Sequence, residues 1–347
     1  MEGDVSTVLA SLRLEIEDTE FSGTLYEFED YYERKLWHQL TLALGNFFAN
    51  PESKIGDLRT RIYDLFVSKF ALKLNQIVVV DFLLAALNDK DLSKEQNVQA
   101  SIERLIDLQT SIKKLYLTEN SNNEYAETDL ENDPAVIYVG LQLARFLLLS
   151  TDKDNHVKAE EILDEVNGKF EGSGHVNEFE PKINAAFYLS KCQLFKISED
   201  YNQFYTNCLL YLSTMASEEE KTSISRISHL EKQKLCYDLA IAALLGSKIY
   251  NFGELILHDI LKSLKDSQWE WLYNLIHTLN AGDLKGFNQW LTQGLQKAPF
   301  LVPSEHFLKQ KIIIMALLEL ISLKPAGNKV LQFSEISDFT GADSNDV

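Results

Sequence analysis

Apolar residues recur every three or four positions along most of this chain, the spacing that gathers them on one face of a helix. The pattern covers nearly every segment from residue 30 to residue 323 and is broken by short polar stretches. Its first strong example is KLWHQLTLAL, in which Leu36, Leu40 and Leu44 share one face and Trp37 flanks it. The pattern predicts a chain that is nearly all helix, with Trp37 as a candidate structural residue.

The polar breaks divide the pattern into a series of predicted helices. We expect helices at 55–72 and 91–118, and between them the almost wholly apolar segment NQIVVVDFLLAALN, which should be deeply buried. The acidic segment TENSNNEYAETDLENDP, at 118–134, lacks periodicity and is predicted to be a loop and a domain boundary. Beyond it the predicted helices come in pairs, followed by two more helices: 135–150 with 156–170, 178–197 with 200–215, 223–246 with 252–264, then 268–280 and 283–296.

The paired helices predict a repeat architecture. A single helical hairpin cannot bury both of its apolar faces, so successive hairpins must stack against one another. We therefore predict an all-α fold, a right-handed α-solenoid of stacked, tetratricopeptide-like hairpins, although the strict tetratricopeptide consensus is absent.

The pattern changes near the end of the chain. SEHFLKQKIIIMALLELISL predicts a helix capped by Ser304, and another short helix should begin at Ser334. A short, apolar, β-prone segment lies between them and is a candidate interface edge: Val330, Leu331, Gln332 and Phe333. A helix, a strand and a helix in this order begin a winged-helix module.

The sequence stops three residues after Ser344, which has the character of a cap for a third helix. We therefore expect the third helix and the wing of this module to be missing here and to belong to a longer native chain. The predicted domains are an N-terminal helical array at 1–133, helical hairpins at 134–300 and an incomplete winged helix at 301–347.

The stretch IYNFGELILHDIL, at 249–261, places polar residues inside an apolar run and raises the question of catalysis. His258 and Asp259 are sequence neighbours, which point about 100° apart on a helix and cannot form a dyad by themselves. Asn251 and Glu254 have the spacing of a capping box, with Gly253 in the first turn. The favoured interpretation is a structural motif that starts a helix, rather than a catalytic site.

Composition narrows the class of protein further. Six prolines and fifteen glycines in 347 residues are few for an all-β chain, and 45% hydrophobic residues suffice for a core. The three cysteines, Cys192, Cys208 and Cys236, have neither disulfide-framework nor zinc spacing, which indicates a reducing compartment. No apolar run reaches the roughly 18 residues that span a membrane. A net charge of −19 repels phosphate backbones, so nucleic-acid binding is disfavoured.

Motifs that carry chemistry are missing from the sequence. The seven histidines are scattered without an HExxH spacing, and neither GxSxG nor a P-loop occurs. We therefore assign no catalytic, cofactor-binding or metal-binding residue, and we do not expect an enzyme.

Three stretches carry a family resemblance: LWHQLTL at 36–42, LLGSKIYNFGELILHDILKSL at 244–264 and SQWEWLYNLIHTLNAGDLKGF at 267–287. They resemble the fungal type of a family of lid subunits, non-ATPase subunit 9 of the 26S proteasome regulatory particle. A helical-hairpin array running into a winged helix is also the architecture of the PCI domain, to which that family belongs.

The resemblance implies a non-catalytic scaffold that supports ubiquitin-dependent degradation and complex assembly in the cytoplasm and nucleus. Its implied partners are other lid subunits, both PCI subunits and the deubiquitinase pair, with no cofactor, nucleic acid or membrane. The chain would be part of a hetero-oligomer there and monomeric when isolated.

Two alternatives remain open at this point. A PCI scaffold of the signalosome or of a translation initiation complex would share the architecture. A nucleic-acid-binding winged-helix protein would need basic residues near the end of the chain, where the sequence instead has acidic ones: Glu335, Asp338, Asp343 and Asp346.

Overall fold

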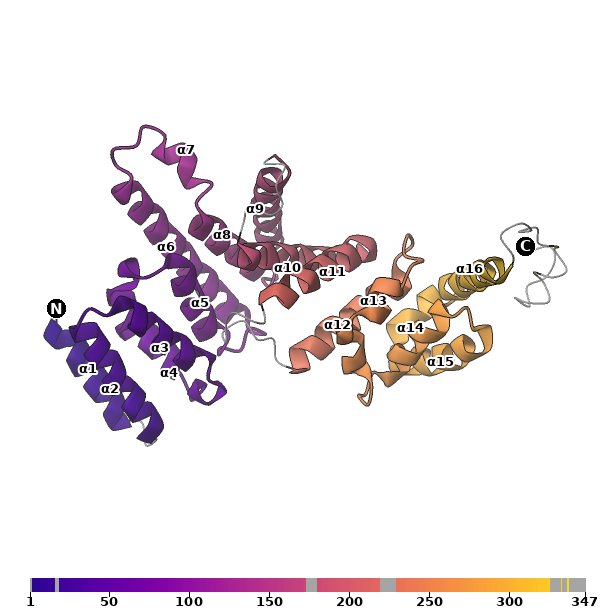
Figure 1. The fold of residues 1–347 in the computed structure, drawn as a ribbon, viewed down its shortest axis with the longest axis horizontal. Coiled ribbons are helices and arrows are strands. Elements are labelled where there is room, and N and C mark those ends of the chain that lie inside the picture. Colours follow the sequence, from indigo (N-terminus) through magenta and orange to yellow (C-terminus); the bar gives the residue numbers. More distant parts are fainter. Residues whose placement is uncertain are drawn as a thin grey trace. The chain divides into compact units, whose positions relative to one another are not determined.

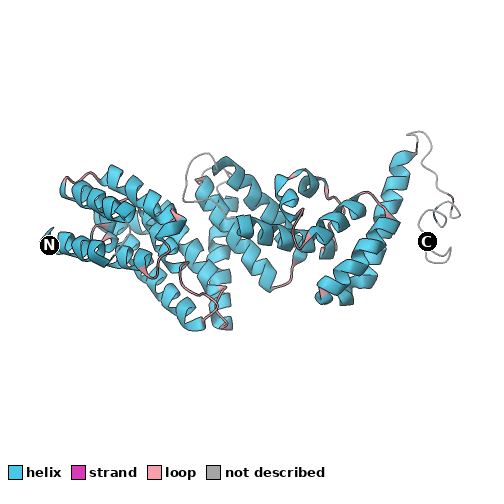
Figure 2. Ribbon diagram, turned by 90° about the horizontal axis from the view of Figure 1, so that it is seen from below, coloured by secondary structure: helices cyan, strands magenta, loops and turns pink. Residues whose placement is uncertain are grey.

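The structure, a computed structural model, describes residues 2–15, 19–172, 180–218 and 229–324 together with Gln332 and Ile336. This described part consists of helices joined by loops and contains no strand (Figure 2). The predicted all-α fold is confirmed, and the packing of successive helices fits a helical-repeat architecture.

Two compact units make up the chain: Met1–Leu194 with Leu210–Arg226, and Phe195–Leu209 with Ile227–Val347. One hydrophobic core continues through the first unit from Val5 to Phe187. The domain boundaries expected after residues 133 and 300 remain predictions.

The helices named next follow the order of the sequence (Figure 1), and the last two of them cross into the second unit, to which Phe195–Leu209 belongs. They are α1 (Glu2–Glu15), α2 (Thr19–Glu33), α3 (Trp37–Ala49), α4 (Leu58–Leu65), α5 (Gln76–Leu87), α6 (Glu95–Glu119), α7 (Ala126–Leu130), α8 (Pro134–Leu147), α9 (Lys153–Gly172), α10 (Pro181–Ile197) and α11 (Tyr201–Glu218). Successive helices pack together, as in α1 with α2, α2 with α3, and α8 with α9. The contact of α8 with α9 is one of the helix pairs that the sequence predicts, 135–150 with 156–170.

Local sequence signals explain where the central helix α8 begins. Pro134 occupies its first position, and the Asp133 side chain accepts hydrogen bonds from the backbone N–H groups of Ala135 and Val136, at 2.9 and 3.0 Å. Nearly all of α8 is buried, because it packs on α6, on α5 and on α9. The apolar helix α5 is also deeply buried, which confirms the prediction for NQIVVVDFLLAALN.

The second unit contains the remaining elements: α12 (His229–Leu245), α13 (Gly253–Leu257), a 3₁₀ helix (Asp259–Leu264), α14 (Glu270–Asn280), α15 (Leu284–Lys297), a 3₁₀ helix (Pro299–Ser304) and α16 (Glu305–Leu323). The hairpin of α14 and α15 turns at Gly282, whose φ of +64° favours glycine. A Cβ at Gly282 would lie 2.9 Å from the Cα of Ala316, so the turn packs closely on α16. Ser304 holds the N-cap position of α16, as predicted, but its side chain makes no capping hydrogen bond.

Two early predictions of local structure are wrong. The segment 55–72 is not one helix, because α4 ends at Leu65 and two 3₁₀ turns follow, Val67–Lys69 and Ala71–Lys73. The backbone changes there so that Phe66 and Phe70 both reach the core, and tertiary packing of these rings outweighs helix continuity. The segment 118–134 is not wholly a loop, since it contains α7.

Candidate assembly sites

Trp37 begins α3 among aromatic rings. Its ring stacks at an angle of 28° on that of Phe70, with centroids 5.7 Å apart, and meets the ring of Tyr32 edge-on at 5.9 Å. The Lys73 Nζ lies 4.9 Å from the centroid of the indole ring. Aromatic pairs of this kind contribute about 0.5–1.5 kcal/mol each beyond their buried area. Trp37 therefore connects α2, α3 and the turns after α4, as a structural role for the LWHQLTL stretch would require.

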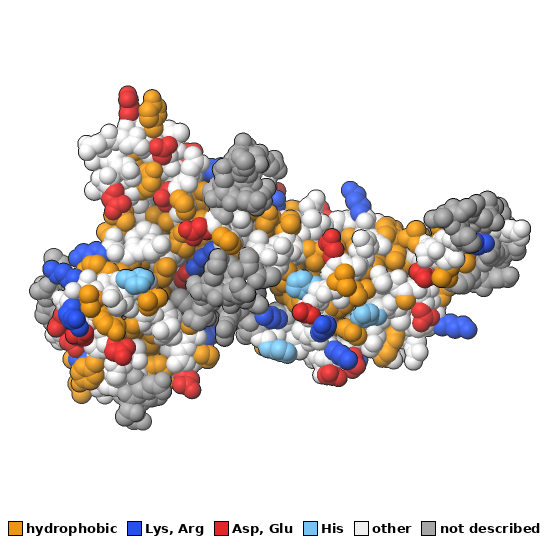
Figure 3. Space-filling view, in the orientation of Figure 1, with side chains coloured by type: hydrophobic (Ala, Val, Ile, Leu, Met, Phe, Trp, Pro, Cys, Tyr) orange, Lys and Arg blue, Asp and Glu red, His pale blue; other side chains and the backbone are white. Residues whose placement is uncertain are grey.

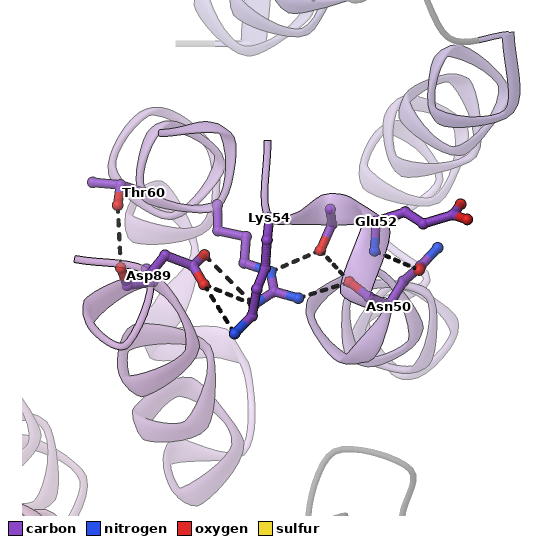
Figure 4. A network of polar contacts seen from close by, with 8 residues as sticks. Asn50, Glu52, Lys54, Thr60 and Asp89 are labelled. Atoms are coloured by element: carbon purple, nitrogen blue, oxygen red, sulfur yellow. Dashed lines mark hydrogen bonds and ion pairs between the residues drawn. The ribbon is translucent and has the colours of Figure 1, made fainter. Parts of the chain in front are cut away.

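A network of polar contacts joins the end of α3, the start of α4 and the end of α5, and Figure 4 labels Asn50, Lys54 and Asp89 within it. Arg59 is 4% exposed and donates to Ser53 Oγ and to the Asn50 carbonyl, both at 2.7 Å. Its third contact is an ion pair with Asp89 at 3.1 Å, to which Lys54 adds a longer one at 3.6 Å. A guanidinium group can satisfy several acceptors in fixed directions, so this network sets the angle between the three helices.

A second cluster of polar side chains, Asp81, Tyr138 and Lys182, lines a pocket of about 230 Å³ in the first unit. The buried carboxylate of Asp81 accepts a 2.8 Å hydrogen bond from Tyr138 Oη and forms an ion pair with Lys182. Burial raises the pKa of Asp81, while Lys182 and Tyr138 act in the opposite direction. The three residues come from α5, α8 and α10, so we interpret the group as a connection between helices of the first unit.

The segment IYNFGELILHDIL forms two short helices, so the single helix predicted over 252–264 is wrong. The backbone is extended at His258, and its Nδ1 accepts a 3.1 Å hydrogen bond from the backbone N–H of Ile260. This break lets the following 3₁₀ helix bury Leu261 and Leu264 beside α12, which outweighs continuing α13. His258 is therefore a capping residue, and Asp259 pairs instead with Lys262 at 2.6 Å.

The predicted capping box at the start of this segment is also displaced. Phe252, not Asn251, holds the N-cap position of α13, and its side chain is fully buried and makes no capping hydrogen bond. Asn251 Oδ1 instead accepts from the backbone N–H of Gly253 at 3.0 Å, and a Cβ on Gly253 would lie 3.1 Å from that oxygen. Glu254 is exposed and does not complete the box; with burial, its charge raises the pKa of Tyr205 to about 12.

Lys311 is a buried residue that binds the start of the LLGSKIYNFGE stretch and that the sequence did not single out. Lys311 is 0% exposed, and its Nζ donates to the carbonyls of Ala243, Leu244 and Gly246 at 2.8, 3.0 and 2.7 Å. These carbonyls end α12, where a cation is favoured by the helix dipole. The Nζ also lies 5.4 Å from the ring centroid of Tyr250. One lysine thus fixes α16 to the end of α12.

A sequence signal for this lysine existed. Lys311 follows Leu308 by three positions and precedes Met315 by four, so it occupies the apolar stripe of α16. A cation in such a stripe predicts a buried partner. The partner itself could not be predicted here, because backbone carbonyls occur at every residue and carry no sequence signal.

The candidate interface edge falls almost wholly outside the described residues. Of Val330, Leu331, Gln332 and Phe333, the structure describes Gln332, whose carbonyl accepts a 3.1 Å hydrogen bond from the N–H of Ile336. The predicted strand, the winged helix and the interface therefore remain predictions.

Groups suited to catalysis or metal binding do not gather in the described part of the chain. It contains no cluster of three or more His, Cys, Asp or Glu side chains that could hold a metal ion. None of its helices is long and apolar enough to cross a membrane. On the face shown in Figure 3, basic side chains lie in small groups among acidic and apolar ones.

Comparison with known proteins identifies the family. The family model for PSD13 N-terminal repeats matches residues 24–276. The 26S proteasome regulatory subunit RPN9 of Saccharomyces cerevisiae is 36% identical over 99% of this chain and 81% of its own length. The probable 26S proteasome regulatory subunit rpn9 of Schizosaccharomyces pombe is 35% identical over 92% of this chain and 74% of its own length.

A plant relative extends the same match. The 26S proteasome non-ATPase regulatory subunit 13 homolog B of Arabidopsis thaliana is 32% identical over 92% of this chain and 75% of its own length. The family resemblance seen in the sequence is thus confirmed along nearly the whole chain. From the family match and this coverage, the chain belongs to the Rpn9/PSD13 family of 26S proteasome regulatory subunits.

Proposed function

We propose that this chain is a non-catalytic structural subunit of the 26S proteasome regulatory particle and supports ubiquitin-dependent degradation by holding neighbouring subunits. The observation that carries the proposal is the match to relatives named as regulatory subunits over almost the entire chain. Stacked helical repeats support it, because they offer long surfaces for other proteins.

The finer parts of the proposal concern place and partners. We place the chain in the lid, in contact with other PCI subunits and with the deubiquitinase pair, in the cytoplasm and nucleus. The polar connections at Arg59, Asp81 and Lys311 suit such a role, since each fixes the angle between helices. They hold the repeats in one geometry and so keep the outer surfaces in register with their neighbours.

Affinity purification of the tagged full-length chain from its own cells, with quantitative mass spectrometry, tests the proposal. Recovery of lid and ATPase subunits in equal amounts is the expected result. Recovery of signalosome or translation initiation subunits instead would refute the proteasome assignment, as would retention of nucleic acid alone.

The predicted interface edge has a test of its own. Phe333→Asp should weaken incorporation into the particle, because an unpaired charge would enter an apolar edge or core. His258→Ala is the control, with an effect limited to lost packing and capping. Equal incorporation of wild type and Phe333→Asp would show that this segment is not an assembly surface.

A further inference from the structure

Another pocket of the first unit, of about 360 Å³, is lined by residues of α6, α7, α8 and α9. The chain turns over beyond the end of α6 and returns through α7 to the start of α8 (Figure 1). Lys169 fixes this return, since its Nζ donates to the Glu131 carbonyl at 2.8 Å and to Glu165 at 2.7 Å. This side chain on α9 therefore ties the segment between α7 and α8 to the wall of the pocket.

The floor of the pocket is aliphatic and its rim is charged. Four aliphatic side chains and one glycine form much of the floor: Val136, Ile137, Ile162, Val166 and Gly140. The charged lining residues are Lys113 on α6, Glu127 on α7, Glu131 just after α7, and the ion-paired Glu165 and Lys169 on α9. An apolar centre inside a polar rim is the arrangement of protein interfaces.

Gly140 is the unusual feature, because it lies in the interior of a buried helix. Glycine is unfavourable there relative to alanine, since it adds backbone freedom to the unfolded chain. Packing does not require it: a Cβ would lie 3.5 Å from Gln109 Nε2 and 3.9 Å from Ile162 Cγ2, both ordinary contact distances. What the missing Cβ provides is depth at the floor of the pocket.

We propose that this pocket receives an aliphatic side chain from a neighbouring subunit of the regulatory particle, with Gly140 leaving the space that the side chain fills. The charges of the lining determine the chemistry of the partner's flanking residues: an acidic group should face Lys113, and a basic group should face Glu127 and Glu131. This inference rests on the proposed function, because the partner is a member of that particle.

Gly140→Ala separates a binding role from a folding role. In the isolated chain this change should raise the thermal midpoint by about 1 to 3 °C, because alanine favours the helix. In the particle it should reduce incorporation about tenfold, since the added methyl group overfills the occupied pocket. A loss of assembly by a stabilised variant cannot come from misfolding.

Gly168→Ala is the matched control. Gly168 also lies in a helix, α9, but a Cβ there would have no atom within 4 Å, and Gly168 does not line the pocket. It should give a similar rise in midpoint and no loss of assembly.

The assay co-expresses full-length wild type and variant with different tags and measures their ratio in purified regulatory particles by mass spectrometry. Lys113→Glu and Glu127→Lys should each lower incorporation. A photo-crosslinker at position 109 should capture a peptide with an aliphatic residue between an acidic and a basic one. Equal incorporation of Gly140→Ala and Gly168→Ala would overturn the pocket proposal while leaving the proposed function intact. Absence of wild type from the particle would overturn both.

Discussion

Replacing the buried ammonium group of Lys311 tests the energetics of the second unit. Burial lowers the pKa of Lys311 to about 7, whereas an unfolded chain has a lysine pKa of about 10.4. Between these two values the unfolded chain binds more protons than the folded chain, so stability rises with pH. The slope approaches about 1.4 kcal/mol per pH unit, which amounts to about 2 kcal/mol between pH 7 and pH 9.

Lys311→Met removes this titration and keeps a side chain of comparable length. The difference in unfolding free energy between wild type and Lys311→Met should therefore change by about 2 kcal/mol in favour of wild type from pH 7 to pH 9. Other groups that titrate in this range are shared by both proteins and cancel in the difference.

Urea unfolding at pH 7, 8 and 9, followed by tryptophan fluorescence, measures the effect. Three of the four tryptophans, Trp269, Trp271 and Trp290, belong to the second unit and report on it. Three carbonyl acceptors match the three protons of an ammonium group and oppose its neutralisation. A difference that stays constant from pH 7 to pH 9 would refute the reasoning and show that the carbonyls outweigh burial.

Two further predictions concern the stability of the fold. Arg59→Met should lower the free energy of unfolding by about 3 kcal/mol, because the largely buried carboxylate of Asp89 then keeps only the longer ion pair, at 3.6 Å, with the more exposed Lys54. Urea unfolding at pH 7 checks this, and a loss below about 1 kcal/mol would count against it. Gly282→Ala should cost about 2 kcal/mol or more, combining positive φ with a clash on α16. Gly56→Ala is its control, with a φ of +55° but no atom within 4 Å of the added Cβ. It should cost only about 1 kcal/mol of backbone strain. Equal losses of unfolding free energy in the two variants would exclude a contribution from the clash.

The sequence pattern gave reliable information wherever a helix has one apolar stripe and a clear start. For α8, Pro134 follows the capping Asp133, and the helix begins one residue before the predicted start at 135. The hairpin of α14 and α15 was also located within two residues, because Gly282 and Asp283 mark the turn locally. These features depend on residues near each other in the chain.

The errors have a common physical origin in contacts between distant residues. The break at His258 follows from burial of Leu261 and Leu264 beside α12, and the turns after Leu65 follow from rings that pack on α2 and α3. The helix propensities of ordinary residues differ by well under 1 kcal/mol. Burying a large apolar side chain contributes about 1.5–3 kcal/mol, which is more. Tertiary packing therefore decides such boundaries.

By itself, the sequence determined the helical class, the pairing of helices and the family, because periodicity, caps and specific stretches are local properties. The tertiary structure alone decided how Arg59 and Lys311 are used and what surrounds Gly140. Their partners are backbone carbonyls and side chains from other helices, which come together only when the helices pack.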